Sequence, residues 1–296
     1  GEAILVETTE DLRLDLDDLA AKAETSGART LLLSHMRGHL CDMDRLMEIT
    51  GEFGIITIED CAHTMGATWR GTRSGNFGLA GCFSTQTYKH MNSGEGGLLL
   101  SDDPQFAARA IILSGSYMLY ERHGAAPGPE HFDDARLDMP NTSARMDHLR
   151  AAILRPQIAS LEGNVARWNA RYKAVASELA RCQAIHLPHR PREEGMVGSS
   201  IQFRVPGLSP AGCRDVISRA ADRGVEIKWF GAEAPAGFTS AHGSWRYMPR
   251  QEMPRSDRVL ADLFDMRLPL TFSVDDCTLI GRILADVAGA ETKAPV

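Results

Sequence analysis

Short apolar runs alternate with helical patterns through the first half of the chain, and this alternation constrains the fold more than any other feature. The expected strands are residues 2–6, 30–34, 55–59, 81–85 and 97–101, and the expected helices are residues 16–24 and 42–53. Strand–helix–strand alternation favours right-handed crossovers and a mostly parallel sheet flanked by helices. The sequence therefore predicts an α/β fold, whose ligands bind beyond the carboxyl ends of the strands.

The second half begins with a long amphipathic helix. Apolar residues recur there at spacings of three and four, over a pattern that extends through residues 144–182. Pro156 is expected to kink or interrupt this helix. Further strands are expected at residues 200–205 and 225–230, and further helices at residues 210–223, 254–266 and 274–288, with Gly224 as a stop signal. We expect a large domain over residues 1–155, and a connecting helix with a smaller α+β domain over residues 156–296.

Charge and hydropathy exclude several classes of partner. The 32 Lys and Arg against 39 Asp and Glu give a net charge of −7, which offers no broad basic field for nucleic acid. The longest apolar runs are the size of a strand, far short of the ~20 residues that cross a bilayer. The N-terminus has no pattern of a signal peptide, and the six cysteines form no C-x-x-C pair. We therefore expect a cytoplasmic protein with free thiols that binds neither nucleic acid nor membrane.

Several standard catalytic motifs are absent from the sequence. It contains no Walker phosphate loop, no G-x-G-x-x-G after a strand, no H-E-x-x-H and no G-x-S-x-G. His35, His39, Cys41 and Asp42 are metal-ligand residue types, but no second pair stands at a zinc-site spacing. These absences weigh against nucleotide hydrolysis, serine hydrolysis and zinc proteolysis, and we expect no bound metal.

Polar residues follow two of the expected strands. The run Ile55-Ile56-Thr57-Ile58-Glu59-Asp60 ends in a carboxylate, with His63 three residues later. Taken alone, Asp60 is better explained as a capping residue and His63 as a packed core histidine. In the later run from Cys82 to Gly97, a strand leads into hydroxyl residues, a lysine and a glycine-rich turn.

This second run resembles the Schiff-base lysine segment of a pyridoxal phosphate enzyme. Lys89 can form an imine with an aldehyde only when its amine is neutral, and a desolvating pocket favours that state. Ser84, five residues earlier, offers a hydroxyl for the phosphate. Asp60 on the neighbouring strand end supplies the carboxylate that keeps the cofactor's ring nitrogen protonated, so that the ring can accept electrons. Lys89 and Asp60 together therefore favour the functional interpretation of both.

The sequence is similar over nearly its whole length to the DegT/StrS sugar-aminotransferase family of fold-type-I pyridoxal phosphate enzymes. The matching stretches are His35-Met36-Arg37-Gly38, IEDCAHTMGATWRG from Ile58, GNFGLAGCFS from Gly75, YKHMNSGEGG from Tyr88, RMDHLRAAI from Arg145 and LPL from Leu268. The resemblance implies that Lys89 anchors the cofactor and moves protons, that Asp60 pairs with the ring nitrogen, that His63 stacks on the ring and that Ser84 binds the phosphate. It also implies that a leading segment found in family members, with a glycine–hydroxyl loop, is not represented here.

Two departures from the family pattern bear on the site. The family's Asn-x-Arg-Met, whose asparagine reaches the partner subunit's cofactor, becomes Asn141-Thr142-Ser143-Ala144-Arg145-Met146. Asn141 or Ser143 is the candidate replacement, and a helix cap is an equal alternative for either. The family's His-Tyr-Pro segment becomes Trp229-Phe230-Gly231, where Trp229 either lines the substrate mouth or packs between domains.

The resemblance implies a homodimeric aminotransferase with shared active sites. It would move an amino group from a donor such as glutamate to a keto-sugar or similar carbonyl acceptor. Family members with histidine in place of the lysine are dehydratases. Four residues separate the family lysine from G-E-G-G, and Lys89 satisfies this count whereas His90 does not. The alternatives left open are a pyridoxal phosphate-dependent dehydratase and a non-catalytic binding or regulatory protein of the same fold.

Overall fold

A computed structural model describes residues 2–116, 119–232 and 241–291. Its first half is built on a four-stranded sheet in the order β1-β2-β5-β6, called the N-terminal sheet below. The strands are β1 (Thr30–Ser34), β2 (Ile56–Asp60), β5 (Ala80–Ser84) and β6 (Gly97–Leu100). β1, β2 and β5 are parallel, while β6 pairs antiparallel with β5 at the edge. The predicted mostly parallel sheet is therefore confirmed, with boundaries displaced by one residue.

The first helices begin and end at residues that the sequence marks for this purpose. Asp15 caps α1 (Leu16–Ser26) by accepting hydrogen bonds from two backbone N–H groups, and Gly27 ends it with φ of 65°. Asp42 caps α2 (Met43–Glu52) in the same way. Asp103 and Gly115 bound α3 (Pro104–Ser114), which the sequence analysis did not predict. α4 (Phe132–Asp138) follows it.

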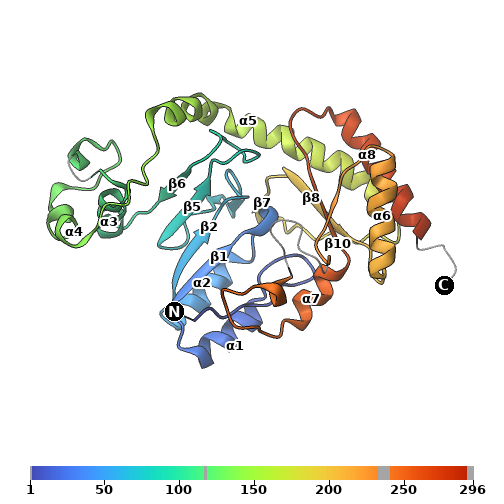
Figure 1. The fold of residues 1–296 in the computed structure, drawn as a ribbon, viewed down its shortest axis with the longest axis horizontal. Coiled ribbons are helices and arrows are strands. Elements are labelled where there is room, and N and C mark those ends of the chain that lie inside the picture. The colour runs from blue at the N-terminus through green and yellow to red at the C-terminus, as the bar shows by residue number, and fades with distance from the viewer. Residues whose placement is uncertain (1, 117–118, 233–240, 292–296) are drawn as a thin grey trace.

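The long helix α5 (His148–Leu179) joins the two halves of the molecule (Figure 1). The helix continues through Pro156, so the predicted interruption does not occur. The second half of α5 lies against α8 (Val274–Glu291).

A three-stranded antiparallel sheet in the order β8-β10-β9, called the C-terminal sheet, forms the centre of the second half. Its strands are β8 (Ser200–Arg204), β10 (Leu263–Arg267) and β9 (Lys228–Trp229), and α6 (Pro210–Asp222) and α8 pack on it. The predicted helix over residues 254–266 is wrong in its second part. α7 (Pro254–Ala261) ends early because Leu263, Phe264, Asp265 and Met266 are all buried as the central strand of this sheet.

Two other strand predictions need correction. Residues 2–6 form no strand, and the extended N-terminal chain is held by side chains near α7 instead. Gln251 accepts a hydrogen bond from the backbone of Leu5, and the buried carboxylate of Glu7 accepts the backbone N–H and the hydroxyl of Ser256. The expected strand over residues 225–230 shortens to β9, because only Lys228 and Trp229 pair with β10. A small sheet in the order β4-β3-β7 completes the fold, with β3 (Thr68–Trp69), β4 (Thr72–Arg73) and β7 (Glu194–Gly195).

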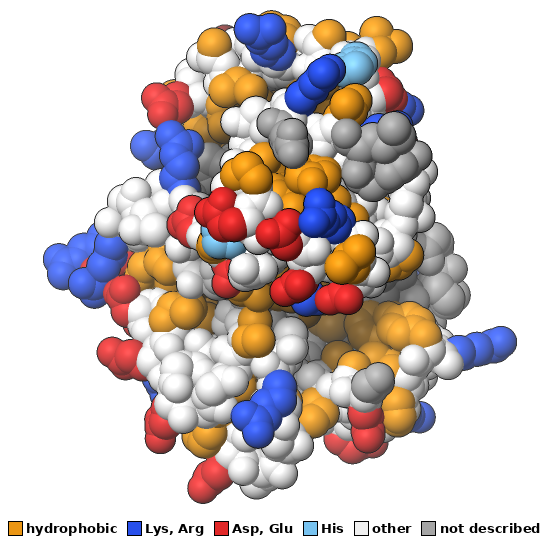
Figure 2. Space-filling model, turned by 90° about the vertical axis from the view of Figure 1, so that its left-hand side faces the viewer, with side chains coloured by type: hydrophobic (Ala, Val, Ile, Leu, Met, Phe, Trp, Pro, Cys, Tyr) orange, Lys and Arg blue, Asp and Glu red, His pale blue; other side chains and the backbone are white. Residues whose placement is uncertain are grey.

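Burial is uneven across the molecule. The largest apolar cluster surrounds the C-terminal sheet and contains Phe203, Phe264 and Leu284, whereas a second cluster packs α1 and α2 on the N-terminal sheet. Leu32 on β1 and Leu137 on α4 remain 68% and 81% exposed. Figure 2 views the molecule from the end that carries α3 and α4 and shows hydrophobic side chains among charged ones on this face. Within the described residues, no helix has the length and apolar character needed to cross a membrane.

Candidate active site

Asp60 is the last residue of β2, at the carboxyl edge of the N-terminal sheet. The parallel register places it between Ser34 of β1 and Cys82 of β5. The Ser34 hydroxyl donates to Asp60 Oδ2 at 3.1 Å, and the backbone N–H of Ala62 donates to Oδ1 at 3.0 Å. These two donors fix the orientation of a carboxylate that remains only half-buried.

Lys89 lies in the turn that follows β5, with its amine beside His63. Lys89 Nζ donates to His63 Nε2 across 3.3 Å. Burial lowers the pKa of Lys89, and the positive charges of Arg37 and Arg267 lower it further, against the opposing effect of Asp60. Burial, followed by the charge of Lys89, lowers the pKa of His63 to about 3, so its imidazole is neutral and accepts this hydrogen bond. The fold thus brings together three predicted site residues from two strand ends.

The remaining two predicted residues form hydrogen bonds with other partners. Ser84 is the last residue of β5, and its hydroxyl accepts a hydrogen bond from the backbone of Gln86 at 3.3 Å. Asn141 follows α4, where its side-chain oxygen accepts the backbone N–H of Ser143 at 2.7 Å. None of its hydrogen bonds reaches the lysine. Its predicted role concerns the cofactor of a partner subunit, and it stays a prediction.

A pocket of about 540 Å³ opens beside Lys89. Its lining combines residues of both halves of the chain, among them Arg37, His63, Trp168, Ser199 and Arg267. Arg37 and Arg267 were not among the predicted site residues. Arg37 stands in a stretch that carries the family resemblance, and Arg267 directly precedes the Leu-Pro-Leu stretch. Their closeness to these matching stretches was the only feature of the sequence that could have indicated that they line the pocket. Trp229 is buried in the C-terminal core and donates to the carbonyl of Ala261 at 2.8 Å, away from this pocket.

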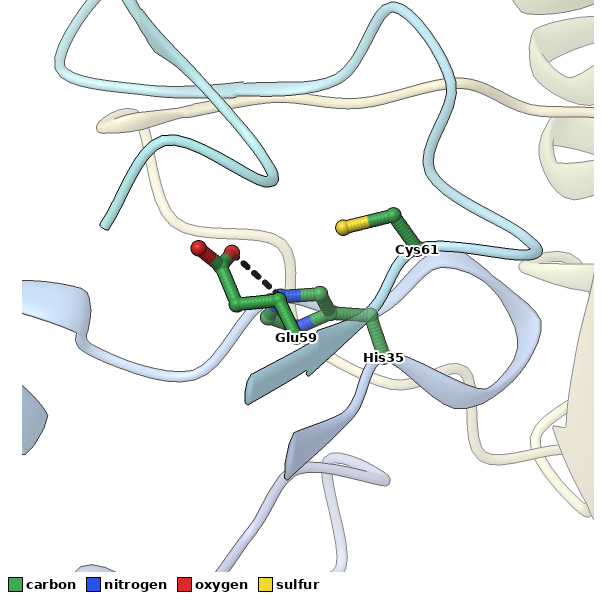
Figure 3. Close-up of side chains that lie close together, drawn as sticks. All are labelled: His35, Glu59 and Cys61. Atoms are coloured by element: carbon green, nitrogen blue, oxygen red, sulfur yellow. Dashed lines mark hydrogen bonds and ion pairs between the residues drawn. The ribbon is translucent and has the colours of Figure 1, made fainter. Parts of the chain in front are cut away.

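A second pair of a histidine and a carboxylate lies next to Asp60 in the chain and in the sheet. Glu59 precedes Asp60 in β2, and His35 follows Ser34, which pairs with Asp60. Among the described residues, only His35, Glu59 and Cys61 are grouped closely enough to hold a metal ion (Figure 3). Glu59 Oε2 accepts hydrogen bonds from His35 Nε2 at 3.1 Å and Gly75 N at 2.8 Å, and Oε1 accepts from the backbone N–H groups of Phe77 and Gly78. Burial raises the pKa of the Cys61 thiol to about 12. All carboxylate positions are used and the thiol is protonated, so this group is a structural hydrogen-bond network.

The structure does not bring together the metal-ligand residue types noted in the sequence, His35, His39, Cys41 and Asp42. His39 Nε2 contacts the side-chain oxygen of Gln202 at 2.8 Å, Cys41 lies against Met43, and Asp42 caps α2. His35 alone joins the network around Glu59. The four residues therefore serve four separate local contacts.

A known protein family matches almost the whole chain. The model of the DegT/DnrJ/EryC1/StrS aminotransferase family matches residues 2–278. The chain belongs to this family. The family and the fold class predicted from the sequence are therefore confirmed.

Other members of the DegT/DnrJ/EryC1/StrS family are similar over part of their length. The chain is 33% identical to the L-glutamine:scyllo-inosose aminotransferase of Streptomyces griseus over 66% of its own residues and 42% of that protein. It is 33% identical to the dTDP-3-amino-3,4,6-trideoxy-alpha-D-glucose transaminase of Streptomyces venezuelae over 57% of its own residues and 42% of that protein. The chain thus spans about two fifths of the length of these curated relatives.

Solved structures confirm the fold over almost the whole chain. The aminotransferase TlmJ from Streptoalloteichus hindustanus superposes with a TM-score of 0.81 at 19% identity, covering 98% of this chain and 74% of that one. The crystal structure of 3-amino-5-hydroxybenzoic acid synthase gives a TM-score of 0.77 at 21% identity, covering 98% and 75%. The described architecture is therefore the fold of these two solved structures.

Proposed function

We propose that the protein is a pyridoxal phosphate-dependent aminotransferase that moves an amino group from an amino acid donor to a keto-sugar or related carbonyl acceptor. The observation that carries this proposal is the position of Asp60 at the end of β2 and of Lys89 in the turn after the neighbouring strand β5, where the charge of Asp60 acts on the pKa of the Lys89 amine. Membership of an aminotransferase family supports it. Two relatives that match the chain are named for the transfer of nitrogen to inososes and to a nucleotide sugar.

The donor set suits the cofactor. Lys89 provides an amine whose pKa is lowered by burial, Asp60 an oriented carboxylate, and Ser84 a hydroxyl at the end of the next strand. When bound, pyridoxal phosphate supplies an aldehyde that condenses with amines and a ring that accepts an electron pair from the substrate carbon. Asp60 would hold the proton on the ring nitrogen, Ser84 would bind the phosphate, and His63 would lie against the ring.

Lys89 has two tasks in this proposal. Its neutral amine is the nucleophile that anchors the cofactor, and the amine then removes a proton from the substrate carbon and returns it elsewhere. His63 assists both tasks because its neutral Nε2 accepts a hydrogen bond from Lys89 Nζ and so holds the amine at the pocket wall. Trp168 of α5 lines the same pocket as Lys89.

We also propose a cytoplasmic homodimer with shared sites, in which Asn141 reaches the phosphate of the partner's cofactor. Six free cysteines support a reducing compartment. The division into residues 1–155 and 156–296 is supported by the largest core cluster, which lies wholly in the second unit. Light scattering of the purified protein tests the dimer, and a monomer with full activity would contradict it.

An absorption titration tests the function. Added pyridoxal phosphate is expected to give the visible band of an imine in the wild-type protein and not in Lys89→Ala. Addition of L-glutamate or L-glutamine should then remove that band and yield the corresponding 2-oxo acid. Imine formation followed by loss of water from a sugar, without nitrogen transfer, would support a dehydratase instead. Absence of the imine in a folded protein would support a non-catalytic relative.

A further inference from the structure

The turn between β5 and β6 carries Lys89 and is closed by its own hydrogen bonds. The backbone N–H of Thr85 donates to the carbonyl of Gly96 at 2.9 Å, and the N–H of Thr87 donates to the carbonyl of Gly94 at 2.9 Å. These bonds fix the shape of the turn. Contacts with residues outside it fix the direction in which the Lys89 side chain leaves the backbone.

His90, the residue after Lys89, contacts the second half of the chain. Its Nε2 lies 2.9 Å from the Ser199 hydroxyl, and its ring meets that of Trp168 edge to face, with the centroids 5.1 Å apart. Ser199 directly precedes β8 and Trp168 belongs to α5, so one imidazole joins the turn to two elements of the second half. The Lys89 amine contacts His63 of the first half instead.

Two further contacts hold the same turn, but both are open to water. Gln157 of α5 exchanges two hydrogen bonds with the backbone of exposed Asn92, at 3.0 and 2.8 Å. The guanidinium of Arg267 lies 4.6 Å from the ring centroid of Tyr88, which is 77% exposed. His90 is only 8% exposed, so water competes least with its hydrogen bond.

The imidazole of His90 is neutral in this position. Burial, followed by the charge of Lys89, lowers the pKa of His90 to about 4. Its Nδ1 is buried and has no hydrogen-bond partner within the described parts of the chain. A buried N–H without an acceptor is rarer than a buried acceptor without a donor. We therefore place the proton on Nε2, which donates to the Ser199 hydroxyl.

We propose that His90 is a positioning residue, which holds the turn against Ser199 so that the Lys89 amine stays in the pocket beside His63. Both partners of the hydrogen bond line this pocket together with Lys89. A lysine side chain is long and flexible, so a fixed backbone narrows the space that its amine can reach. The inference rests on the proposed function, in which the same amine first anchors the cofactor and then reaches the substrate carbon.

Loss of this hydrogen bond should let water reach the Lys89 amine. Burial is the largest cause of the lowered pKa of Lys89, so better hydration should raise this pKa toward its ordinary value of 10.5. The charged groups that also act on the amine are Asp60, Arg37 and Arg267. The variants below leave all three in place, so a rise in the pKa reports hydration of the amine.

Competitive acetylation of the cofactor-free protein tests this expectation. Acetic anhydride reacts with neutral amines, and mass spectrometry of the peptides gives the pH at which each lysine is half-reactive. Ser199→Ala and His90→Phe should raise this midpoint for Lys89 by about 0.3–1 pH unit, the equivalent of one hydrogen bond. Exposed Lys173 of α5 is the internal reference and should not change. His90→Gln should keep the wild-type midpoint, because its amide can also donate to Ser199.

Ser256→Ala is the matched control variant. The Ser256 hydroxyl is buried, donates to Glu7 Oε2 at 2.6 Å and lies outside the pocket. Its loss should lower the free energy of unfolding and leave the midpoint of Lys89 unchanged. Ser199 is half-buried, so Ser199→Ala keeps the test valid if His90→Phe disturbs folding. Equal midpoints in the wild type and Ser199→Ala, or an equal rise in Ser256→Ala, overturn the inference.

The cofactor-loaded protein gives a second readout. In the half-reaction with whichever of L-glutamate and L-glutamine reacts, a displaced amine slows proton transfer and leaves donor binding intact. Ser199→Ala should therefore lower the limiting rate about three- to tenfold, with the half-saturating donor concentration unchanged. A change confined to the half-saturating concentration would assign Ser199 to donor binding and overturn the inference.

The two proposals fail in different ways. If no imine forms while the midpoint of Lys89 still depends on Ser199, the proposed function is wrong and the contact that holds Lys89 stands. If the imine forms and reacts with amino donors while the midpoint ignores both Ser199 and His90, the function stands and the positioning role is wrong.

Discussion

Glu59 and Asp60 are consecutive residues of β2 with different surroundings. Consecutive side chains of a strand point to opposite faces. Glu59 points into the interior, where it is fully buried and accepts four hydrogen bonds from His35 and three backbone N–H groups. Asp60 ends the strand with two donors and a half-buried carboxylate close to Lys89.

The histidines of the two groups differ in the same way. His35 is buried and bonded to Glu59, whereas His63 lines a pocket and contacts an amine that is free to react. A carboxylate whose oxygens are all occupied stabilises the fold, and one with capacity left can bind a ligand. The two groups therefore differ in the saturation of their hydrogen bonds and not in residue type.

The largest expected effect is at Lys89. Lys89→Ala removes the nucleophile and the proton carrier together, so amino transfer should fall by at least about 10³-fold. The free energy of unfolding should change little because the side chain is partly exposed. Stopped-flow or steady-state assays with coupled 2-oxo acid detection measure the rate, and thermal unfolding checks the fold. Turnover close to wild type would remove Lys89 from the site.

Asp60→Asn tests the functional carboxylate. The amide keeps the size of the side chain but cannot hold a proton on the cofactor's ring nitrogen, so the rate should fall about 10²-fold or more. Imine formation at Lys89 should persist, since the amine itself is unchanged. Single-turnover absorbance separates the two steps. A rate within a factor of two of the wild type would mean that Asp60 has only a structural role.

Glu59→Gln tests the structural carboxylate. The amide places an NH₂ group against backbone donors, and we expect a loss of about 2–4 kcal/mol in the free energy of unfolding. Urea denaturation measures it. Glu162→Gln is the matched control, because Glu162 pairs with Arg73 at 2.8 Å while 82% exposed, and should cost less than about 1 kcal/mol. Equal losses in the two variants would contradict the comparison.

A pH dependence of stability is expected at His63. Its folded pKa of about 3 lies below the ordinary value of 6.5, so the unfolded chain binds the proton more readily between these values. The free energy of unfolding therefore falls as pH drops from about 6.5 toward 3, by at most about 1.4 kcal/mol per pH unit for this group. His63→Gln should make this slope shallower in the cofactor-free protein. Parallel curves for both proteins would refute the assignment.

The sequence predicted most of the elements that carry the site. Local periodicity and caps predicted the strands β1, β2, β5 and β6 and the helices α1 and α2, and motifs identified the Asp60 and Lys89 segments. These parts could be recognised without coordinates. β10 could not, because its apolar residues fit a helix as well as a strand and only pairing with β8 and β9 decides between them. The sequence analysis did not predict that Arg37 and Arg267 line the same pocket, because nothing in the sequence indicates that two arginines 230 positions apart lie close together.

By itself, the sequence determined the family and the α/β alternation, and it predicted roles for Lys89, Asp60 and Ser84, since these inferences depend on residue types at short spacings. The tertiary structure decided which carboxylates can still accept hydrogen bonds from a ligand. In the folded chain, Glu59 accepts hydrogen bonds at both oxygens, and His35 and His39 contact different partners. Two arginines line the pocket beside Lys89. Burial and contacts between distant segments set these outcomes, because the electrostatic environment of a side chain depends on neighbours that the local sequence does not specify.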